Sequence, residues 1–292
     1  MKGKFHALYI GIFLLVGILS IVILVVNGIS YYTLPIEERF FSSLHLSLKP
    51  SGAIGHGLGI IGTIMMIIGV ASYMIRKRVR RMFDLGYLKY WLEFHIFMCT
   101  VGPILVLFHT AFKFGGIVAV SFWSMVIVVL SGVVGRFIYV QIPRTIQGKE
   151  IDINELNETE SILTEQLLFE YNLNKEIIDS ISNSTKPIKY VNMSLSMSMF
   201  TVLKEIFTFN SFLTHLKSEL KKQGITDHNK RHKIIHITKQ KMILSRRIGM
   251  LRTMQKLFRY WHIFHLPFAF SMFIIMLIHV GVTIAFGYRW LF

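Results

Sequence analysis

HIFMCTVGPILVLFH, residues 95–109, places a histidine at each end of an apolar run, and HLPFAFSMFIIMLIH, residues 265–279, repeats the pattern. In each stretch the two histidines lie 14 residues apart. Fourteen residues of α-helix make close to four turns, so both imidazoles share one helix face, about 21 Å apart along the axis. Histidines are rare inside bilayers and usually mark functional positions there. The two stretches therefore predict two membrane helices that each carry a pair of functional histidines.

The composition of the chain is that of an integral membrane protein. Of its 292 residues 53% are hydrophobic, and the mean hydropathy is +0.53. Several apolar runs reach the ~20 residues that cross the hydrocarbon core of a bilayer. The basic residues behind the net charge of +16 cluster beside these runs, which indicates membrane orientation and argues against nucleic-acid binding.

Five apolar runs predict five transmembrane helices, covering roughly residues 7–28, 54–75, 91–112, 117–140 and 261–286. The second run is rich in glycine at its start, which allows close approach of another helix. The cluster RKRVRR, residues 76–81, places the following loop on the cytoplasmic side, where Lys and Arg accumulate. We therefore expect a protein of the bacterial inner (plasma) membrane, with the N-terminus cytoplasmic and the C-terminus outside.

A long polar segment separates the fourth and fifth runs, and we expect it to form a helical cytoplasmic insert over residues 141–258. Its second half, residues 213–260, carries thirteen Lys or Arg against two acidic residues. Residues 194–213 are almost long enough to span, but Lys204 and Glu205 would each cost about 2.5–3.5 kcal/mol at the centre of a membrane helix. This part therefore predicts an amphipathic helix on the inner membrane surface.

The third and fifth predicted spans run in the same direction, so their histidines lie at matched depths. His95 and His265 lie at the inner depth, and His109 and His279 at the outer depth. Haem iron accepts axial imidazoles, and two of them hold a haem from opposite sides. The histidines therefore predict two b haems, one between each matched pair. They are bound non-covalently, because the chain has no CxxCH motif and a single cysteine, Cys99.

Three further residues are candidates for contact with haem. Gly102 lies midway between His95 and His109, where the absence of a side chain would give room between two stacked macrocycles. Arg136, near the inner end of the fourth span, needs an anionic partner, either a haem propionate or a membrane phosphate. His56, at the outer end of the second span, is a candidate to bond an outer propionate, to bind a quinone, or to face headgroups.

His262 competes with His265 for the inner haem. It lies 17 residues from His279, which rotates it about 100° from the face of that residue, whereas His265 is only about 40° away. We therefore expect His265 to be the ligand. His262 is expected at the membrane interface, near a haem propionate or among headgroups.

The repeated H-x13-H pattern on two parallel helices resembles the membrane core of cytochromes b. It is similar to the quinol-oxidising cytochrome bc subunit and to the transmembrane domain of ferric reductases and NADPH oxidases. The resemblance covers roughly residues 54–140 and 259–286. It implies a four-helix core with two stacked b haems and electron transfer through the bilayer, with His95, His109, His265 and His279 as the axial ligands.

The predicted fold is an all-α integral membrane protein with five transmembrane helices, a four-helix haem-binding core and a helical cytoplasmic insert. It has four parts along the chain. They are an N-terminal helix with its outer loop (1–53), spans two to four of the core (54–140), the insert (141–258) and the last span of the core (259–292).

The predicted function is electron transfer across the membrane, from an inner donor to an outer acceptor. The donor is a quinol or a docked reductase, because the sequence has no nucleotide fingerprint for a flavin or nicotinamide site of its own. Expected partners are the lipid bilayer, redox proteins on one or both faces and a quinone. Two alternatives are a histidine-lined transition-metal transporter, which would need acidic or thiolate partners at membrane depth, and a structural membrane anchor of a redox complex, which would not explain the paired spacing.

Overall fold

A computed structural model describes residues 2–144, 150–171, 173, 175–184, 187–190, 193–225 and 227–286. Over these ranges the regular structure is entirely helical, and the one β-type pairing is an isolated bridge between Arg144 and Glu150. Within the same ranges, five helices are long and apolar enough to cross a membrane. The predicted all-α class and the predicted number of spans are therefore confirmed.

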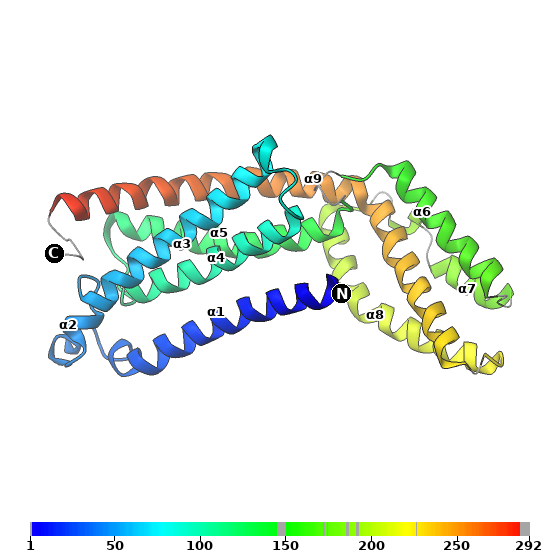
Figure 1. The fold of residues 1–292 in the computed structure, drawn as a ribbon, viewed down its shortest axis with the longest axis horizontal. Helices are drawn as coiled ribbons and strands as arrows, with labels where there is room; N and C mark the ends of the chain where they lie inside the picture. The colour runs from blue at the N-terminus through cyan, green and yellow to red at the C-terminus, as the bar shows by residue number, and fades with distance from the viewer. Residues whose placement is uncertain are drawn as a thin grey trace. The chain divides into compact units, whose positions relative to one another are not determined.

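The helices follow one another along the chain as the colours of Figure 1 show. Their bounds are α1 Lys2–Tyr32, η1 Glu38–Phe41, α2 His45–Leu48, α3 Ala53–Arg78, η2 Arg80–Met82, α4 Leu88–His109, α5 Gly116–Gln141, α6 Ile153–Glu165, η3 Gln166–Glu170, α7 Lys175–Ser184, η4 Pro187–Tyr190, α8 Leu195–Lys222 and α9 His228–Ala285. The candidate spans lie in α1, α2–α3, α4, α5 and α9. The last of these helices is much longer than its predicted span, because the basic segment and the apolar segment form one continuous helix.

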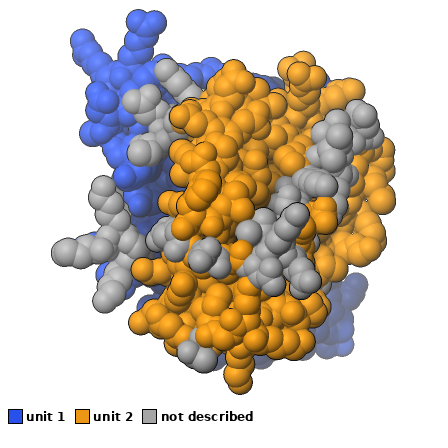
Figure 2. All heavy atoms as spheres, turned by 90° about the vertical axis from the view of Figure 1, so that its right-hand side faces the viewer, with its two compact units in different colours: residues 1–134, 146–148, 263–292 blue, residues 135–145, 149–262 orange. Residues whose placement is uncertain are grey.

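The chain divides into two compact units, coloured blue and orange in Figure 2. Unit 1 comprises residues 1–134, 146–148 and 263–292, and unit 2 comprises residues 135–145 and 149–262. Helices α5 and α9 contribute to both units. The four histidines predicted as haem ligands all belong to unit 1, whereas Arg136 and His262 belong to unit 2.

In unit 1, helices α3 and α4 approach closely through glycines. A Cβ added to Gly62 would meet the Gly102 carbonyl oxygen at 2.7 Å, and one added to Gly102 would meet the Gly62 carbonyl oxygen at 2.8 Å. Gly69 continues the contact, since a Cβ there would lie 2.7 Å from the Cβ of Met98. Small residues at such a contact let two membrane helices pack backbone to backbone. The backbone of α3 is therefore within reach of side chains on α4.

The other helices of unit 1 complete the packing around this pair. A buried cluster joins α3, α5 and α9 through Met66, Phe122, Met125, Met272 and Met276. Side chains of α4 pack against the same cluster. On α1, Phe13 stacks on Phe97 of α4 with ring centroids 4.3 Å apart. Helices α3, α4, α5 and the apolar end of α9 thus share one core, with α1 packed against α4.

The turn that follows α4 is held in place by one buried arginine. After His109 the chain turns through Ala111 and Phe112, whose φ angles of 47° and 58° lie in the left-handed region. Such angles are uncommon for residues other than glycine and need support from the surrounding structure. Arg39 supplies it by donating hydrogen bonds to the carbonyl oxygens of Ala111 and Tyr32. The end of α4 that carries His109 is therefore fixed to the connection after α1.

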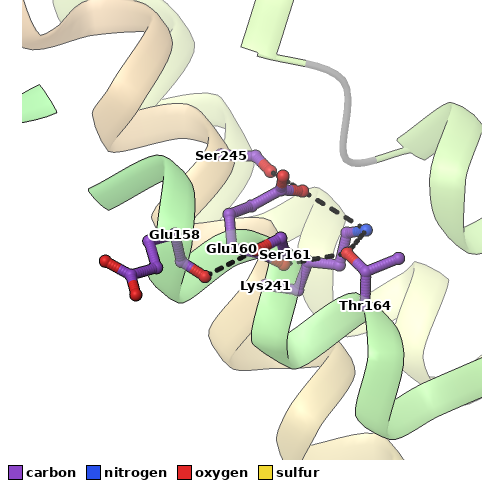
Figure 3. A network of polar contacts seen from close by, with 6 residues as sticks. All are labelled: Glu158, Glu160, Ser161, Thr164, Lys241 and Ser245. Atoms are coloured by element: carbon purple, nitrogen blue, oxygen red, sulfur yellow. Dashed lines mark hydrogen bonds and ion pairs between the residues drawn. The ribbon is translucent and has the colours of Figure 1, made fainter. Parts of the chain in front are cut away.

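In the described part of unit 2, the buried cations Lys241 and Arg246 are each paired with a carboxylate. Lys241 of α9 is only 5% exposed; its ammonium lies 3.3 Å from the Glu160 carboxylate and donates to the Thr164 hydroxyl at 2.6 Å. Ser245 donates to the same carboxylate at 3.4 Å, as Figure 3 shows. Removing a charged group from water is tolerated when its partners satisfy it in this way. The contacts of Figure 3 therefore tie α6 to α9.

A second polar cluster in unit 2 ties α8 to α9. Arg246 lies 3.4 Å from the Glu205 carboxylate and donates to the Gln141 side chain at 3.1 Å. Burial, followed by the hydrogen bond to Glu205, raises the pKa of the nearby Tyr190, and the charge of Arg246 opposes this increase. Helix α8, which contains most of the segment 194–213, is not among the candidate spans found in the described residues. Its position at a membrane surface stays a prediction.

Candidate functional site

Both histidines of α4 are hydrogen-bonded to the backbone of α3. His109 donates from Nδ1 to the carbonyl oxygen of Gly55 at 2.8 Å, and His95 donates from Nδ1 to that of Gly69 at 3.1 Å. The two acceptors are 14 residues apart on α3, as the two histidines are on α4. A carbonyl can only accept, so the proton is on Nδ1 and the lone pair is on Nε2. This tautomer is the one in which Nε2 coordinates a metal.

A glycine allows the His109 ring to reach the α3 backbone. A Cβ added to Gly59 would lie 2.8 Å from Cγ and from Nδ1 of that ring. Carbon atoms in contact prefer separations of about 3.5–4.0 Å, so any larger residue would displace the imidazole. Glycine at this position is therefore a requirement for the observed orientation of His109.

His265 of α9 is oriented by a side chain of α5. Its Nδ1 lies 2.7 Å from the hydroxyl oxygen of Ser131, which is buried. The Ser131 hydroxyl also donates to the carbonyl oxygen of Val128 at 2.9 Å. The Ser131 hydroxyl can donate to only one of these two neighbours at a time, so either ring or hydroxyl is the donor in its bond with His265. In both cases Nδ1 is the nitrogen held by α5, and Nε2 is the other ring nitrogen, as in the two α4 histidines.

The outer histidines gather at one end of unit 1. His56 and His279 are both close enough to interact electrostatically with His109. The ring centroids of His56 and His109 are 6.3 Å apart, and the planes are inclined by 64°. The structure thus places the His56 ring next to that of His109, with His279 within electrostatic range of both.

The two histidines predicted for the inner haem, His95 and His265, contact different neighbours. The ring of His95, on α4, contacts α3. There the Tyr73 ring lies next to it, tilted, with the two centroids 5.6 Å apart. His265 faces Ser131 on α5. The contacts given above for the described residues do not join the two imidazoles to each other. The pairing of His95 and His265 on one haem therefore stays a prediction, whereas the structure defines the orientation of each ring.

The remaining predicted residues have other observed neighbours. Gly102 lies at the contact with α3, so its missing side chain serves the approach of the two helices. Arg136 lies over the ring of Tyr139, 5.7 Å from its centroid. His262 donates from Nδ1 to the carbonyl oxygen of Phe258, one turn earlier in its own helix, at 3.3 Å. The predicted contacts of these three residues with haem stay predictions.

The described residues contain no group of three or more His, Cys, Asp or Glu side chains arranged to hold a metal ion. Axial ligation of haem needs only one imidazole on each side of the iron. The donor set of unit 1, imidazoles held through Nδ1, fits that requirement.

Sequence reasoning missed the groups that orient the histidines. Ser131 carried no signal, because serine is common in membrane helices and nothing in its spacing marks it. The carbonyl acceptors did carry one, since Gly55 and Gly69 repeat the 14-residue interval of the histidines within the glycine-rich second span.

Comparison with known proteins gives no relative: no family model, no curated protein and no solved structure matches this chain. A functional proposal therefore depends on the residues and their geometry.

Proposed function

We propose that this chain is a dihaem b-type cytochrome that carries electrons across a membrane. One observation carries the proposal: in three of the four paired histidines, Nδ1 is hydrogen-bonded to a group on a neighbouring helix. Ligating histidines generally donate their other ring nitrogen to a carbonyl or another oxygen, which fixes the ring and raises its basicity. Any buried imidazole N–H needs an acceptor; what favours ligation is that the same ring nitrogen is engaged in all three, and that the two α4 rings repeat the arrangement at a 14-residue interval.

The histidines of unit 1 would bind two haems, one at each of two depths in the membrane. His109 and His279 would hold the outer haem, and His95 and His265 the inner haem. Each haem would supply reversible one-electron chemistry at its iron. The chain supplies ring orientation, through two α3 carbonyls and Ser131, and an apolar environment from which water is excluded.

The finer assignments follow from the same proposal. The membrane is the bacterial inner membrane, and the RKRVRR segment, residues 76–81, faces the cytoplasm because basic loops stay on that side. Electrons enter from an inner donor, a quinol or a docked reductase, and leave to an outer acceptor. His56, beside the outer pair, is proposed to contact a haem propionate or a quinone.

Haem content tests the proposal. Full-length protein, expressed with added haem precursor and purified in detergent, should give a reducible b-type α-band and two non-covalent b haems per chain by pyridine haemochrome. The oxidised spectrum should be low-spin, because both axial positions are imidazole. A content of fewer than about one haem per chain, with four axial imidazoles available for two irons, would overturn the proposal.

A further inference from the structure

Helix α8 of unit 2 exposes a stripe of apolar side chains in its first half. Met197, Phe200 and Leu203 are 52%, 59% and 48% exposed. Residues three apart lie on the same side of a helix, so the three form one continuous strip. Lys204 is exposed beside it. Large apolar side chains exposed together, and not singly, indicate a surface that is covered in the working protein.

The opposite side of α8 locates this stripe relative to the membrane. Val202 is buried in a cluster with Met250 and Met254 of α9 and with Ile138 of α5. Ile138 belongs to the last turn of the candidate span Gly116–Gln141. Since the buried side of α8 packs against the end of a membrane span, the first half of α8 lies at the depth where that span leaves the bilayer.

Charge in the adjoining part of α9 points to the same environment. Arg252, Lys256 and Arg259 are exposed at positions four and three residues apart, so they share one side of the helix. The Lys256 ammonium lies 5.8 Å from the ring centroid of Tyr260, which is also exposed. Cations followed by an aromatic residue, just before an apolar span, match the headgroup layer of a membrane with anionic lipid.

A transmembrane position for α8 is opposed by its own contacts. Glu205 pairs with Arg246 of α9 at 3.4 Å within unit 2. Crossing the bilayer would break this pair or carry it into hydrocarbon, where charged groups are unfavourable. A position along the surface keeps the pair and leaves Lys204 among the headgroups.

We infer that the first half of α8 lies in the boundary between headgroups and acyl chains of the phospholipid bilayer, with Met197, Phe200 and Leu203 inserted among the chains. An amphipathic helix binds a bilayer in this way, through its apolar face and through cations that meet anionic headgroups. Unit 2 is then attached to the membrane along α8 as well as through α5 and α9. This inference is independent of haem binding.

Spin labelling of the full-length protein tests the inference. In a Cys99→Ala background, a nitroxide is attached at Phe200→Cys, and at Ser218→Cys as the control, since Ser218 is an exposed polar position on the same helix. The protein is reconstituted in phosphatidylcholine–phosphatidylglycerol nanodiscs. Power-saturation EPR then compares collisions with oxygen, which concentrates in acyl chains, and with a neutral nickel chelate, which stays in water.

The label at position 200 should collide mainly with oxygen, and the label at position 218 mainly with the nickel chelate. Equal access of the nickel chelate to both positions would overturn the inference, because the stripe would then face water. Shielding of position 200 from both reagents would also overturn it and would indicate cover by protein, such as a second copy. A label at Leu203→Cys repeats the measurement should the first substitution disturb folding, and the outcome does not depend on haem content.

Discussion

Helices α4 and α9 carry the same pair of histidines at the same spacing, yet they hold them differently. On α4 both imidazoles donate to backbone carbonyls of α3. On α9, His265 is hydrogen-bonded to the Ser131 hydroxyl, and His279 lies within electrostatic range of His109. A backbone partner cannot be deleted by substitution, whereas a side-chain partner can. The difference teaches that the orientation of the α4 histidines depends on how closely two helices approach, and that of His265 on one side chain.

The largest effect is expected from loss of a ligand. His109→Ala and His279→Ala should each remove the outer haem, and His95→Ala and His265→Ala the inner one, because one imidazole leaves one axial position of the iron empty. Haem-to-protein ratios should fall from two to one, with loss of a different component of the α-band in each group.

The control for these variants is His262→Ala, which should keep both haems, since that ring bonds within its own helix. Loss of a haem in His262→Ala together with retention of both in His265→Ala would show that the inner ligand on α9 is misassigned.

The next effect concerns the close approach of α3 to α4. Gly59→Ala should strongly reduce outer-haem content while leaving the inner haem in place, because the new methyl group would lie 2.8 Å from two atoms of the His109 ring. Gly132→Ala on α5 is the matched control, since a Cβ there meets nothing within 4 Å. Equal spectra for the two variants would contradict the dependence of His109 on helix approach.

A smaller effect should follow from removal of the side chain that is hydrogen-bonded to His265. Ser131→Ala should retain both haems but weaken the inner one, since loss of a partner to a ligating histidine typically costs about 10–100-fold in affinity. The rate of haem transfer to apomyoglobin and the redox midpoint of the inner haem measure this.

Ser20→Ala is the control for Ser131→Ala, because Ser20 is half-buried and its hydroxyl donates to the carbonyl oxygen of Val16 in its own helix. A midpoint shift of the same size in both variants would argue against orientation of His265 by Ser131.

The smallest effect on the haems is expected from unit 2, where substitution should change stability alone. Lys241→Met leaves the Glu160 carboxylate without its buried partner, and removing one member of a buried pair costs about 3–5 kcal/mol. Glu160 is one-quarter exposed, which places the expected loss near the lower end. Thermal unfolding followed by circular dichroism should show the loss, with haem content unchanged.

Lys222→Met provides the comparison for Lys241→Met. Its ion pair with Glu219 lies at the surface, where solvent screens the charges, so no measurable change in unfolding temperature is expected. Equal destabilisation by the two substitutions would mean that burial of Lys241 has no energetic role.

The sequence predicted those features that depend on local pattern. The five spans follow from apolar runs of sufficient length, and the shared face of each histidine pair follows from the helical period. Close approach along the glycine-rich second span was also expected, and α3 does pack against α4 in this way.

The parts that could not be predicted depend on how separate helices meet. Which carbonyl oxygen accepts the hydrogen bond from His109 is set by the axial register of α3 against α4, and no local pattern encodes that register. Gly102 illustrates the limit, because the same missing side chain serves helix approach or space for a cofactor equally well. In unit 2, Lys241 read as one cation in a basic segment, and only the fold shows that it is buried against Glu160.

Electron transfer across a sealed membrane tests the central proposal most directly. The protein is reconstituted in vesicles with a reductant trapped inside and an impermeant oxidant outside, and the haem spectrum is followed with time. The proposal predicts that both haems are oxidised from the outside and reduced again from the inside, and that His109→Ala, which lacks the outer haem, stops the flow. Unchanged electron flux in vesicles that carry His109→Ala would contradict a relay through two haems.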